Sequence, residues 1–238
     1  AVVMFTANRP WYLRRALRAL KNHWPESAPL LVISQDGAES TTHALIESLA
    51  PEVKHVCYQE PTRIGGQALR KGFTPYYRIA QHFGHTLSSL FSNSEIERVI
   101  VLEDDIEISA DFFPFMERLT PELERNTDLL ALSAWNDHGQ YASCPETVHR
   151  TDCFPGQGWM ITRPVWTTLE PYWPGAFWDE WLRTPGARQG RQCLRPELNR
   201  VRNFGRSGTG SSDFFDSYIA PLRCQEEALP DNSVLELS

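Results

Sequence analysis

From residue 1 to residue 57, short strand-like runs alternate with segments that carry apolar side chains at helical spacing. Continuous apolar runs at 1–5 and 30–34 are short and rich in β-branched residues, as in strands that are buried on both faces, and a third strand is expected at 53–57. Between these expected strands, residues 10–21 and 41–49 carry apolar side chains at helical spacing. The order strand-helix-strand-helix-strand predicts an α/β fold with a mostly parallel central sheet and flanking helices.

Further elements are expected after residue 60, although the periodicity weakens toward the C-terminus. A stripe of apolar residues after Pro75 predicts a long helix. We also expect strands at 99–102 and 129–133 and helices at 111–119 and 214–222. Between Pro145 and Pro196 regular periodicity is weak, and Trp, Pro and Gly are frequent. We expect this stretch to belong to the same domain as the residues before it.

Three consecutive acids, Glu103, Asp104 and Asp105, end the apolar run at 99–102. Because unpaired charges are costly in a core, we expect them at the carboxyl end of the strand, facing water, a cation or a ligand. The strand is expected to aim all three at one point. Their hard oxygen atoms suit Mg²⁺ or Mn²⁺, with the remaining positions filled by water or phosphate. A solvated acidic turn is the alternative.

Two other polar residues follow predicted strands and are expected at the same edge of the sheet. Arg9 comes after the first strand, and Asp36 comes after the second. Together with the acids they suit a nucleotide, with phosphate at Arg9, base or ribose at Asp36, and a metal at the diphosphate. Taken alone, each of these two residues is explained equally well as a capping residue at the protein surface. The sequence lacks GxGxxG after its first strand and lacks GxxxxGK[ST], so it indicates neither a dinucleotide fold nor a P-loop.

A third group lies at residues 177–181, where Asp179 and Glu180 stand between Trp178 and Trp181. Partial desolvation by the indoles would raise the pKa of a carboxylate and make it a better general base. A structural carboxylate that is hydrogen-bonded to an indole is an equally good interpretation. His82 follows the apolar helical stripe, and its sequence position favours a core or helix-surface histidine over a ligand contact.

Composition narrows the function without defining it. The chain of 238 residues has a net charge of −7, which argues against broad nucleic-acid binding. It contains no apolar run of about 18 residues, so we expect no membrane contact within this segment. The five cysteines form no CxxC pair, so a zinc site is not expected.

Longer motifs resemble those of the N-acetylglucosaminyltransferase I family. The resemblance covers nearly the whole chain, and the motifs occur in the family's order: VLEDDIEISADFF at 101–113, SAWND at 133–137, RTDCFPGQGW at 150–159, LEPYWPGAFWDEW at 169–181, RQGRQCLRPE at 188–197 and FGR at 204–206. The resemblance implies a single GT-A catalytic domain over 1–238, with a Rossmann-like nucleotide-sugar-binding half at 1–105 and an acceptor-side half at 106–238. A loop at 205–212 is expected to be mobile and to close over the bound donor.

The resemblance also implies an activity. Members carry out an inverting, Mn²⁺-dependent transfer of N-acetylglucosamine from UDP-GlcNAc to a mannose hydroxyl of a glycan or glycoprotein, forming a β-1,2 linkage. The same fold with another UDP-sugar or acceptor, and a non-catalytic glycan-binding module, are the alternatives. A Golgi lumen location is expected, and the family's membrane anchor and stem have no counterpart within these residues.

Roles carry over from the family residue by residue. Asp179 would be the catalytic base, Asp105 the metal ligand, and Glu103 and Asp104 contacts of the donor's sugar and ribose. The full set of implied donor-binding residues is Arg9, Asp36, His82, Glu103, Asp104, Asp105, Gln157, Trp178, Gly210 and Ser211. Gln157 stands where members tend to carry Leu against the acetamido group. Gly210 stands where the family loop places a phosphate-binding Ser, with Ser211 next to it.

Overall fold

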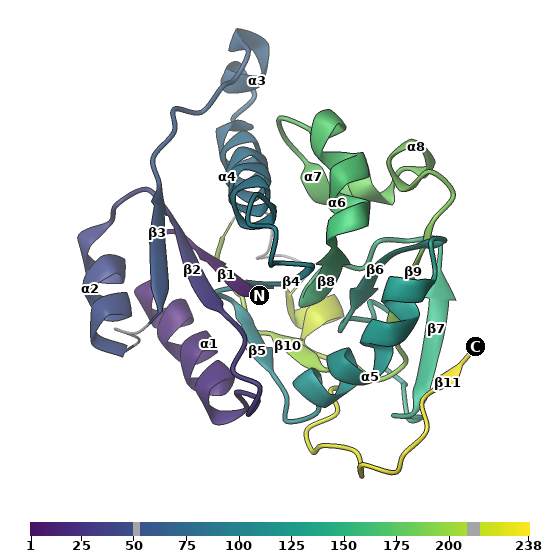
Figure 1. The fold of residues 1–238 in the computed structure, drawn as a ribbon. Coiled ribbons are helices and arrows are strands. Elements are labelled where there is room, and N and C mark those ends of the chain that lie inside the picture. Colours follow the sequence, from purple (N-terminus) through teal and green to yellow (C-terminus); the bar gives the residue numbers. More distant parts are fainter. Residues whose placement is uncertain (50–52, 209–214) are drawn as a thin grey trace.

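A nine-stranded sheet forms the centre of the molecule (Figure 1). The structure is a computed structural model that describes residues 1–49, 53–208 and 215–238. The strands are arranged in the order β11-β7-β9-β6-β8-β4-β1-β2-β3, and β5 and β10 pair separately as a short antiparallel ribbon. The α/β class with a mostly parallel sheet and flanking helices is therefore confirmed.

The N-terminal half follows the predicted alternation closely. Its four sheet strands pair in parallel: β1 (Val2–Thr6), β2 (Leu31–Asp36), β3 (Lys54–Tyr58) and β4 (Arg98–Glu103). The helices between them are α1 (Pro10–Asn22), α2 (Ser40–Leu49), the short α3 (Gly66–Arg70) and the long α4 (Thr74–Phe91). Proline in the first turn of α1 and α4 suits their starts, because the first helical N–H groups have no partner within the helix.

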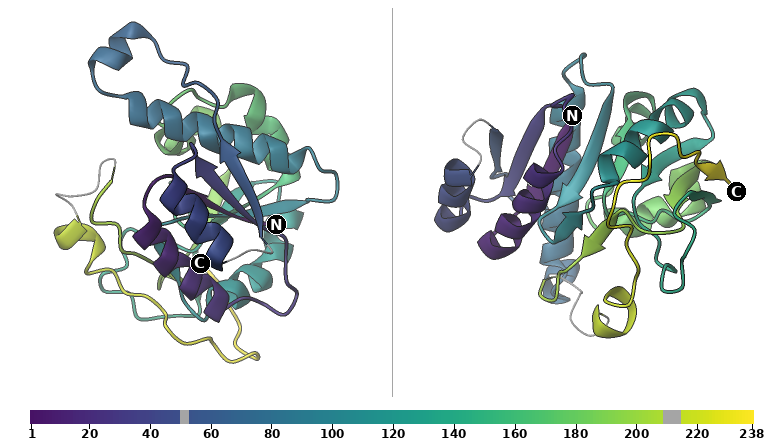
Figure 2. Two further views of the ribbon diagram at one scale, coloured as in Figure 1. Left: turned by 90° about the vertical axis from the view of Figure 1, so that its left-hand side faces the viewer. Right: turned by 90° about the horizontal axis from the view of Figure 1, so that it is seen from below.

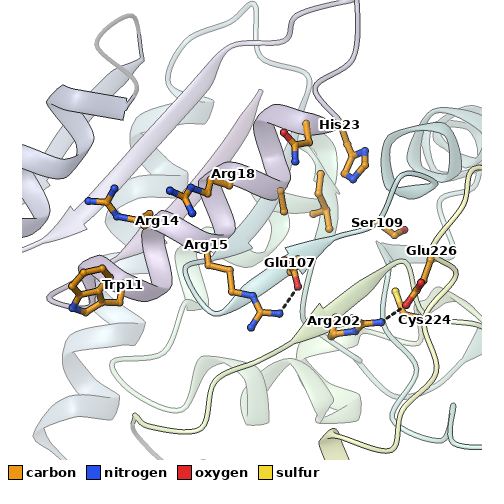
Figure 3. Close-up of a pocket in the computed structure, with 13 residues that line it drawn as sticks. Trp11, Arg14, Arg15, Arg18, His23, Glu107, Ser109, Arg202, Cys224 and Glu226 are labelled. Atoms are coloured by element: carbon orange, nitrogen blue, oxygen red, sulfur yellow. Dashed lines mark hydrogen bonds and ion pairs between the residues drawn. The ribbon is translucent and has the colours of Figure 1, made fainter.

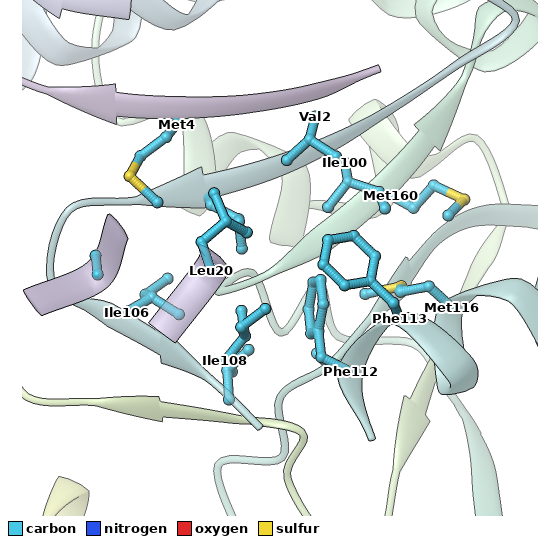
Figure 4. Packing of buried hydrophobic residues seen from close by; sticks show 14 of the residues in the cluster. Val2, Met4, Leu20, Ile100, Ile106, Ile108, Phe112, Phe113, Met116 and Met160 are labelled. Atoms are coloured by element: carbon cyan, nitrogen blue, oxygen red, sulfur yellow. The ribbon is translucent and has the colours of Figure 1, made fainter. Parts of the chain in front are cut away.

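Alternate residues of each central strand pack against opposite layers of helices. Val2 and Met4 face a cluster that includes α1 and α5, whereas Val3 and Phe5 face a cluster that includes α4 and α6. Figure 4 shows the first cluster, where Phe112 and Phe113 pack toward the strand residues. Figures 1 and 2 show the helices on both sides of the sheet. Since burying a large apolar side chain is worth about 1.5–3 kcal/mol, both layers fix the strand ends that carry the polar residues.

The C-terminal half contains more of the sheet than its sequence pattern indicates. Its elements are β5 (Ile106–Ile108), α5 (Phe112–Arg125), β6 (Leu129–Ser133), β7 (Thr147–Thr151), β8 (Trp159–Thr162), α6 (Arg163–Leu169), η1 (Glu170–Tyr172), α7 (Trp178–Arg183), α8 (Pro185–Arg188), β9 (Gln192–Pro196), β10 (Val201–Asn203), η2 (Phe215–Ile219) and β11 (Glu236–Leu237). The region of weak periodicity thus supplies β7, β8 and β9. Every residue of β8 is buried, but the strand is only four residues long, too short to stand out as an apolar run among the surrounding Trp, Pro and Gly.

β8 joins the two halves of the sheet. It lies antiparallel between β4 and β6, with Trp159 opposite both Val101 and Ser133. The helix expected at 111–119 extends to Arg125, and the helix expected at 214–222 is a short π-helix, η2. Among the described residues, no helix combines the length and the hydropathy that crossing a membrane requires.

Candidate functional site

A cavity of about 410 Å³ lies at the edge of the sheet where three parallel strands end. β1, β2 and β4 run side by side, with Phe5 opposite both Ser34 and Glu103. Ligands of open α/β sheets bind beyond this edge. Six of the residues expected from the sequence line the cavity together: Arg9, Asp36, His82, Glu103, Asp104 and Asp105.

The three acids after β4 do not converge on one point. Asp104 is only 1% exposed, accepts a hydrogen bond from Thr6 Oγ1 at 2.7 Å and forms an ion pair with Arg9. Asp105 lies nearer the surface and accepts a hydrogen bond from Arg9 Nη1 at 3.0 Å. Asp104 thus lines the cavity with its carboxylate already paired to a cation, the guanidinium of Arg9. Its burial is compensated by a guanidinium and a hydroxyl, which the sequence pattern did not reveal.

The electrostatics of this edge favour an additional cation. The pKa of Glu103 is raised to about 8, first by burial and then by the negative charges of Asp105 and Asp104. Burial also raises the pKa of Asp104 to about 6, against the opposing charge of Arg9. Because Arg9 pairs with only two of these three carboxyl groups, a further positive charge would lower the energy of their ionised forms.

The donor atoms suit a metal ion that arrives with its own oxygen ligands. Within the described part of the chain, residues 103–105 do not bring three carboxylate ligand atoms within 4.8 Å of one another. A divalent cation held here would need oxygen atoms from elsewhere. Mg²⁺ and similar hard ions are commonly held by one or two carboxylates together with substrate phosphates and water. The residues present therefore fit an ion that is bound together with a diphosphate.

Arg78 is a site residue that the sequence analysis missed. Its Nε donates to Asp36 Oδ2 at 2.7 Å, and its Nη2 lies 2.7 Å from Asp36 Oδ1. Burial raises the pKa of Asp36, and the pairing with Arg78 opposes that shift. Arg78 lies one turn before His82 on α4, and this i, i+4 spacing could have placed both on the same face of the helix.

His82 lies at the inner wall of the cavity as an uncharged side chain. It is 3% exposed, and its Nε2 forms a 2.8 Å hydrogen bond with Ser34 Oγ. Its ring stacks on Tyr58 with centroids 5.0 Å apart. Burial, followed by the positive charges of Arg78 and His85, lowers the pKa of His82 to about 3. His82 can therefore offer a neutral hydrogen-bonding group at neutral pH, but not a cation for a phosphate.

Asp179 borders the same region, although not in the environment expected from its tryptophan neighbours. Its side chain is 44% exposed and forms an ion pair with Arg183 at 3.3 Å, and that of Glu180 is 66% exposed and pairs with Arg183 at 2.8 Å. Arg183, rather than an indole N–H, is thus the polar partner of this half-exposed carboxylate, and the role of Asp179 as a base stays a prediction. The charge of Asp179 nevertheless contributes to the raised pKa of Glu103, which places the two carboxyl groups near each other.

Trp178 lies beneath the site rather than in the cavity lining. It is 7% exposed and stacks on Phe83, with ring centroids 4.6 Å apart. Trp159 stacks on its ring as well, at 5.8 Å. Phe83 does line the cavity, so Trp178 supports a wall of the site from behind. The preceding Phe177 has a φ of 53°, and this left-handed residue begins the turn that presents Asp179.

Gln157 lies at the start of β8, in a strained turn. Its φ is 43°, and Gly156 and Gly158 on either side also have positive φ. The antiparallel pairing of β8 with β4 directs this turn toward the carboxyl end of β4. Asn203 Nδ2 donates to Gln157 Oε1 at 3.0 Å, which fixes the side-chain amide.

The segment after β10 closes one side of the cavity. Arg9 Nη1 donates to the carbonyl oxygen of Ser207 at 3.0 Å, and Gly208 lines the cavity. A Cβ on Gly205 would lie 2.7 Å from Asp105 Oδ2, so a side chain at this position would displace the carboxylate. Gly210 and Ser211, and with them part of the loop expected at 205–212, lie outside the described residues.

A larger cavity of about 920 Å³ lies on a different surface and does not contain this chemistry. Figure 3 shows that both acids described in its lining are already paired, Glu107 with Arg15 and Glu226 with Arg202. No cluster of carboxylates like that at residues 103–105 lies among the described residues of this lining. The cavity at the ends of β1, β2 and β4 is therefore the better candidate for an active site.

Comparison with solved structures identifies the fold. TarS residues 1–349 of S. aureus, in complex with UDP-GlcNAc, matches with a TM-score of 0.57 and 14% identity over 89% of this chain and 60% of that chain. The mannosyltransferase PcManGT from Pyrobaculum calidifontis, in complex with GDP-Man and Mn²⁺, matches with a TM-score of 0.50 and 14% identity over 82% and 54%. At such low identity the likeness concerns the fold, which is the GT-A fold.

Sequence comparison identifies the family. Residues 1–233 match the model that describes the GNT-I family. The chain is 36% identical over 233 residues to the alpha-1,3-mannosyl-glycoprotein 2-beta-N-acetylglucosaminyltransferase of Arabidopsis thaliana. The alignment covers 95% of this chain and 51% of that protein. The chain thus spans about half the length of this curated relative. A family match over nearly all of its residues, together with the GT-A fold, shows that the chain belongs to the GNT-I family.

Proposed function

We propose that this chain is an inverting glycosyltransferase that moves N-acetylglucosamine from UDP-GlcNAc to a mannose hydroxyl of a glycan, in a β-1,2 linkage and with Mn²⁺. The observation that carries the proposal is the single cavity that contains Arg9, Asp36 and the acids at 103–105. The family relationship supports N-acetylglucosamine as the sugar and mannose as the acceptor.

The nucleotide is proposed to lie along the ends of β1 and β2. Asp36 accepts hydrogen bonds, and the paired Arg78 holds its carboxylate in place, so this end of the cavity suits a uracil or ribose. His82 adds a neutral hydrogen-bonding group next to Asp36. Arg9, at the other end, offers a guanidinium next to the acids and suits a phosphate.

The diphosphate is proposed to lie beside Asp105, which would be the direct protein ligand of a metal ion. Mn²⁺ bound there would neutralise the charge that develops on the leaving diphosphate. Glu103 and Asp104 would contact the sugar and the ribose of the donor. Gln157, at the turn before β8, and Trp178, from behind Phe83, would shape the pocket for the sugar.

Asp179 is the proposed catalytic base. An inverting transfer needs a carboxylate on the acceptor side of the sugar, opposite the leaving diphosphate, to take the proton of the attacking hydroxyl. The exposed position of Asp179 suits a group that an incoming glycan must reach. Docking of the acceptor would remove water from this carboxylate, and Arg183 would hold it in place meanwhile.

A transfer assay tests the proposal. Purified protein is given UDP-GlcNAc, Mn²⁺ and a glycan with a terminal mannose, and the product linkage is determined. Asp105→Ala should abolish transfer, whereas the matched variant Glu107→Ala, which changes a partly buried acid two residues away that pairs with Arg15, should retain it. Transfer at the same rate in Asp105→Ala would contradict the metal site. Preference for another UDP-sugar would redefine the donor.

A non-catalytic glycan-binding module remains the second candidate from the sequence. The buried, charge-rich cavity counts against it, because a glycan-binding surface has no need of an arginine among three acids. Release of UDP from UDP-GlcNAc by the wild type, but not by Asp105→Ala, would exclude that alternative. For the whole protein we propose a glycoprotein acceptor, in keeping with the name of the relative from Arabidopsis thaliana, and a Golgi lumen location, which the family resemblance implies.

A further inference from the structure

Two histidines and a cysteine meet at the edge of the sheet away from the donor cavity. His55 and Cys57 are alternate residues of β3, so both side chains lie on the same face of this strand. His43 reaches them from α2, the helix that packs beside β3 (Figure 1). One ligand atom from each of the three residues lies within 4.8 Å of the other two.

We propose that His43, His55 and Cys57 form a binding site for a Zn²⁺ ion. Two imidazoles and one thiolate are ligands that zinc prefers, whereas Mn²⁺ and Mg²⁺ prefer oxygen. The site is therefore chemically distinct from the carboxylates of the donor cavity. Water or another small ligand would complete the tetrahedron.

The distances between the ligand atoms are close to those that a tetrahedral zinc ion requires. Zn–S bonds of about 2.3 Å and Zn–N bonds of about 2.1 Å at a tetrahedral angle separate sulfur and nitrogen by about 3.6 Å. Cys57 Sγ lies 3.7 Å from His55 Nε2 and 4.0 Å from His43 Nδ1. Movements of a few tenths of an ångström in these two pairs would therefore seat the ion.

The surrounding residues orient both imidazoles. Glu47 Oε1 lies 3.3 Å from His43 Nε2, which leaves Nδ1 directed at the thiol, as in the carboxylate–histidine–zinc arrangement. His55 Nε2 is held 3.0 Å from Gln35 Oε1, and the amide nitrogen of Gln35 donates to the carbonyl oxygen of Glu39. Zinc on His55 Nε2 would replace that hydrogen bond, and the imidazole would carry its proton on Nδ1 instead. The thiol proton of Cys57 would be released to solvent.

A bound ion would join α2 to the outermost strand of the parallel half of the sheet. β3 has only β2 as a partner in the nine-stranded order, so one of its edges is unpaired within that sheet. A metal bridge between α2 and β3 would fasten this edge and would stabilise the folded state by an amount that grows with the free zinc concentration.

Calorimetric titration of chelator-treated, full-length protein with Zn²⁺ alone, without nucleotide, tests the proposal. One ion is expected to bind per chain, and Co²⁺ in its place should give tetrahedral d–d bands and a thiolate-to-cobalt charge-transfer band. Cys57→Ser should abolish that band and weaken binding at least 100-fold. Glu47→Gln, which keeps all three ligands, should weaken binding by about 10-fold.

Matched controls separate this site from other sources of metal binding. Cys153→Ser, at an exposed cysteine elsewhere, and Asp105→Ala, in the donor cavity, should both bind Zn²⁺ like the wild type. Circular dichroism of the metal-free variants checks that Cys57→Ser folds, and His43→Ala, on the histidine that α2 contributes, repeats the test. An unchanged Zn²⁺ affinity in Cys57→Ser and His43→Ala, or a loss confined to Asp105→Ala, would overturn the proposal.

Discussion

Burial of an uncharged His82 should make the protein lose stability in mild acid. The pKa of His82 is lowered from the ordinary value of 6.5 to about 3, first by burial and then by the charges of Arg78 and His85. In the unfolded chain the imidazole binds a proton below about pH 6.5, whereas in the folded protein it stays neutral until about pH 3. The stabilisation is therefore fully present above pH 6.5 and is lost as the pH falls from 6.5 toward 3.

The size of the effect follows from the difference in proton binding. Each pH unit below 6.5 costs about 1.4 kcal/mol, so at pH 5 the loss from His82 is about 2 kcal/mol relative to pH 8. With a urea dependence of about 2 kcal/mol per molar, the unfolding midpoint would move by about 1 M. His82→Gln can still hydrogen-bond with Ser34 but carries no titratable ring. It should therefore be less stable at pH 8, since the stacking on Tyr58 is lost, yet should lose about 2 kcal/mol less than the wild type on going to pH 5.

Urea denaturation at pH 8 and pH 5 measures this difference directly. Carboxyl groups titrate over the same range, so the comparison between variants carries the information rather than the wild-type curve. His138→Gln, which removes a histidine from an exposed position, serves as the control and should follow the wild type. An equal loss of stability in His82→Gln and the wild type would refute the account of His82 as a buried, neutral side chain.

Three further predictions concern the proposed reaction. Asp179→Asn should keep UDP-GlcNAc and Mn²⁺ affinity in calorimetry but lower turnover by about 10²–10⁴-fold, while Glu180→Gln retains much of it; the reverse pattern would move the base to Glu180. Asp105→Ala should abolish Mn²⁺-dependent UDP binding, and an unchanged titration would remove Asp105 from the metal. Gln157→Leu should favour UDP-GlcNAc over UDP-glucose by about 10- to 200-fold more than the wild type in competing-donor assays, because a single apolar contact is worth about 1–3 kcal/mol; unchanged selectivity would show that Gln157 does not contact the acetamido group.

Local patterns in the sequence were sufficient to predict much of the fold. The runs at 1–5 and 30–34 became β1 and β2, and the stripe after Pro75 became α4, because each element buries a continuous set of its own side chains. The β-α-β order also placed Arg9 and Asp36 at one edge, since parallel strands share their direction. β8 was missed, because its buried run is only four residues long and lies in a stretch where Trp, Pro and Gly are frequent.

The candidate site was only partly predictable. Position relative to the strands brought Arg9, Asp36 and Asp105 into one cavity, but it did not show that Asp104 is buried against Thr6 and Arg9. Desolvation of Asp179 was expected from its tryptophan neighbours in the sequence. In the structure Trp178 turns into the core, and the carboxylate points to solvent and to Arg183. Adjacent residues of a helix face different directions, so proximity in sequence does not imply contact.

The sequence by itself determined the order of strands and helices in the N-terminal half, the family, and which polar residues follow the first strands, because these depend on neighbours in the chain. Only the tertiary structure decided which of those residues are charged, paired or exposed. Ionisation depends on desolvation and on charges contributed by distant segments, as Arg9 does for Asp104 and Arg78 for Asp36. The same holds for His43 and Cys57, which come together only because α2 folds back on β3.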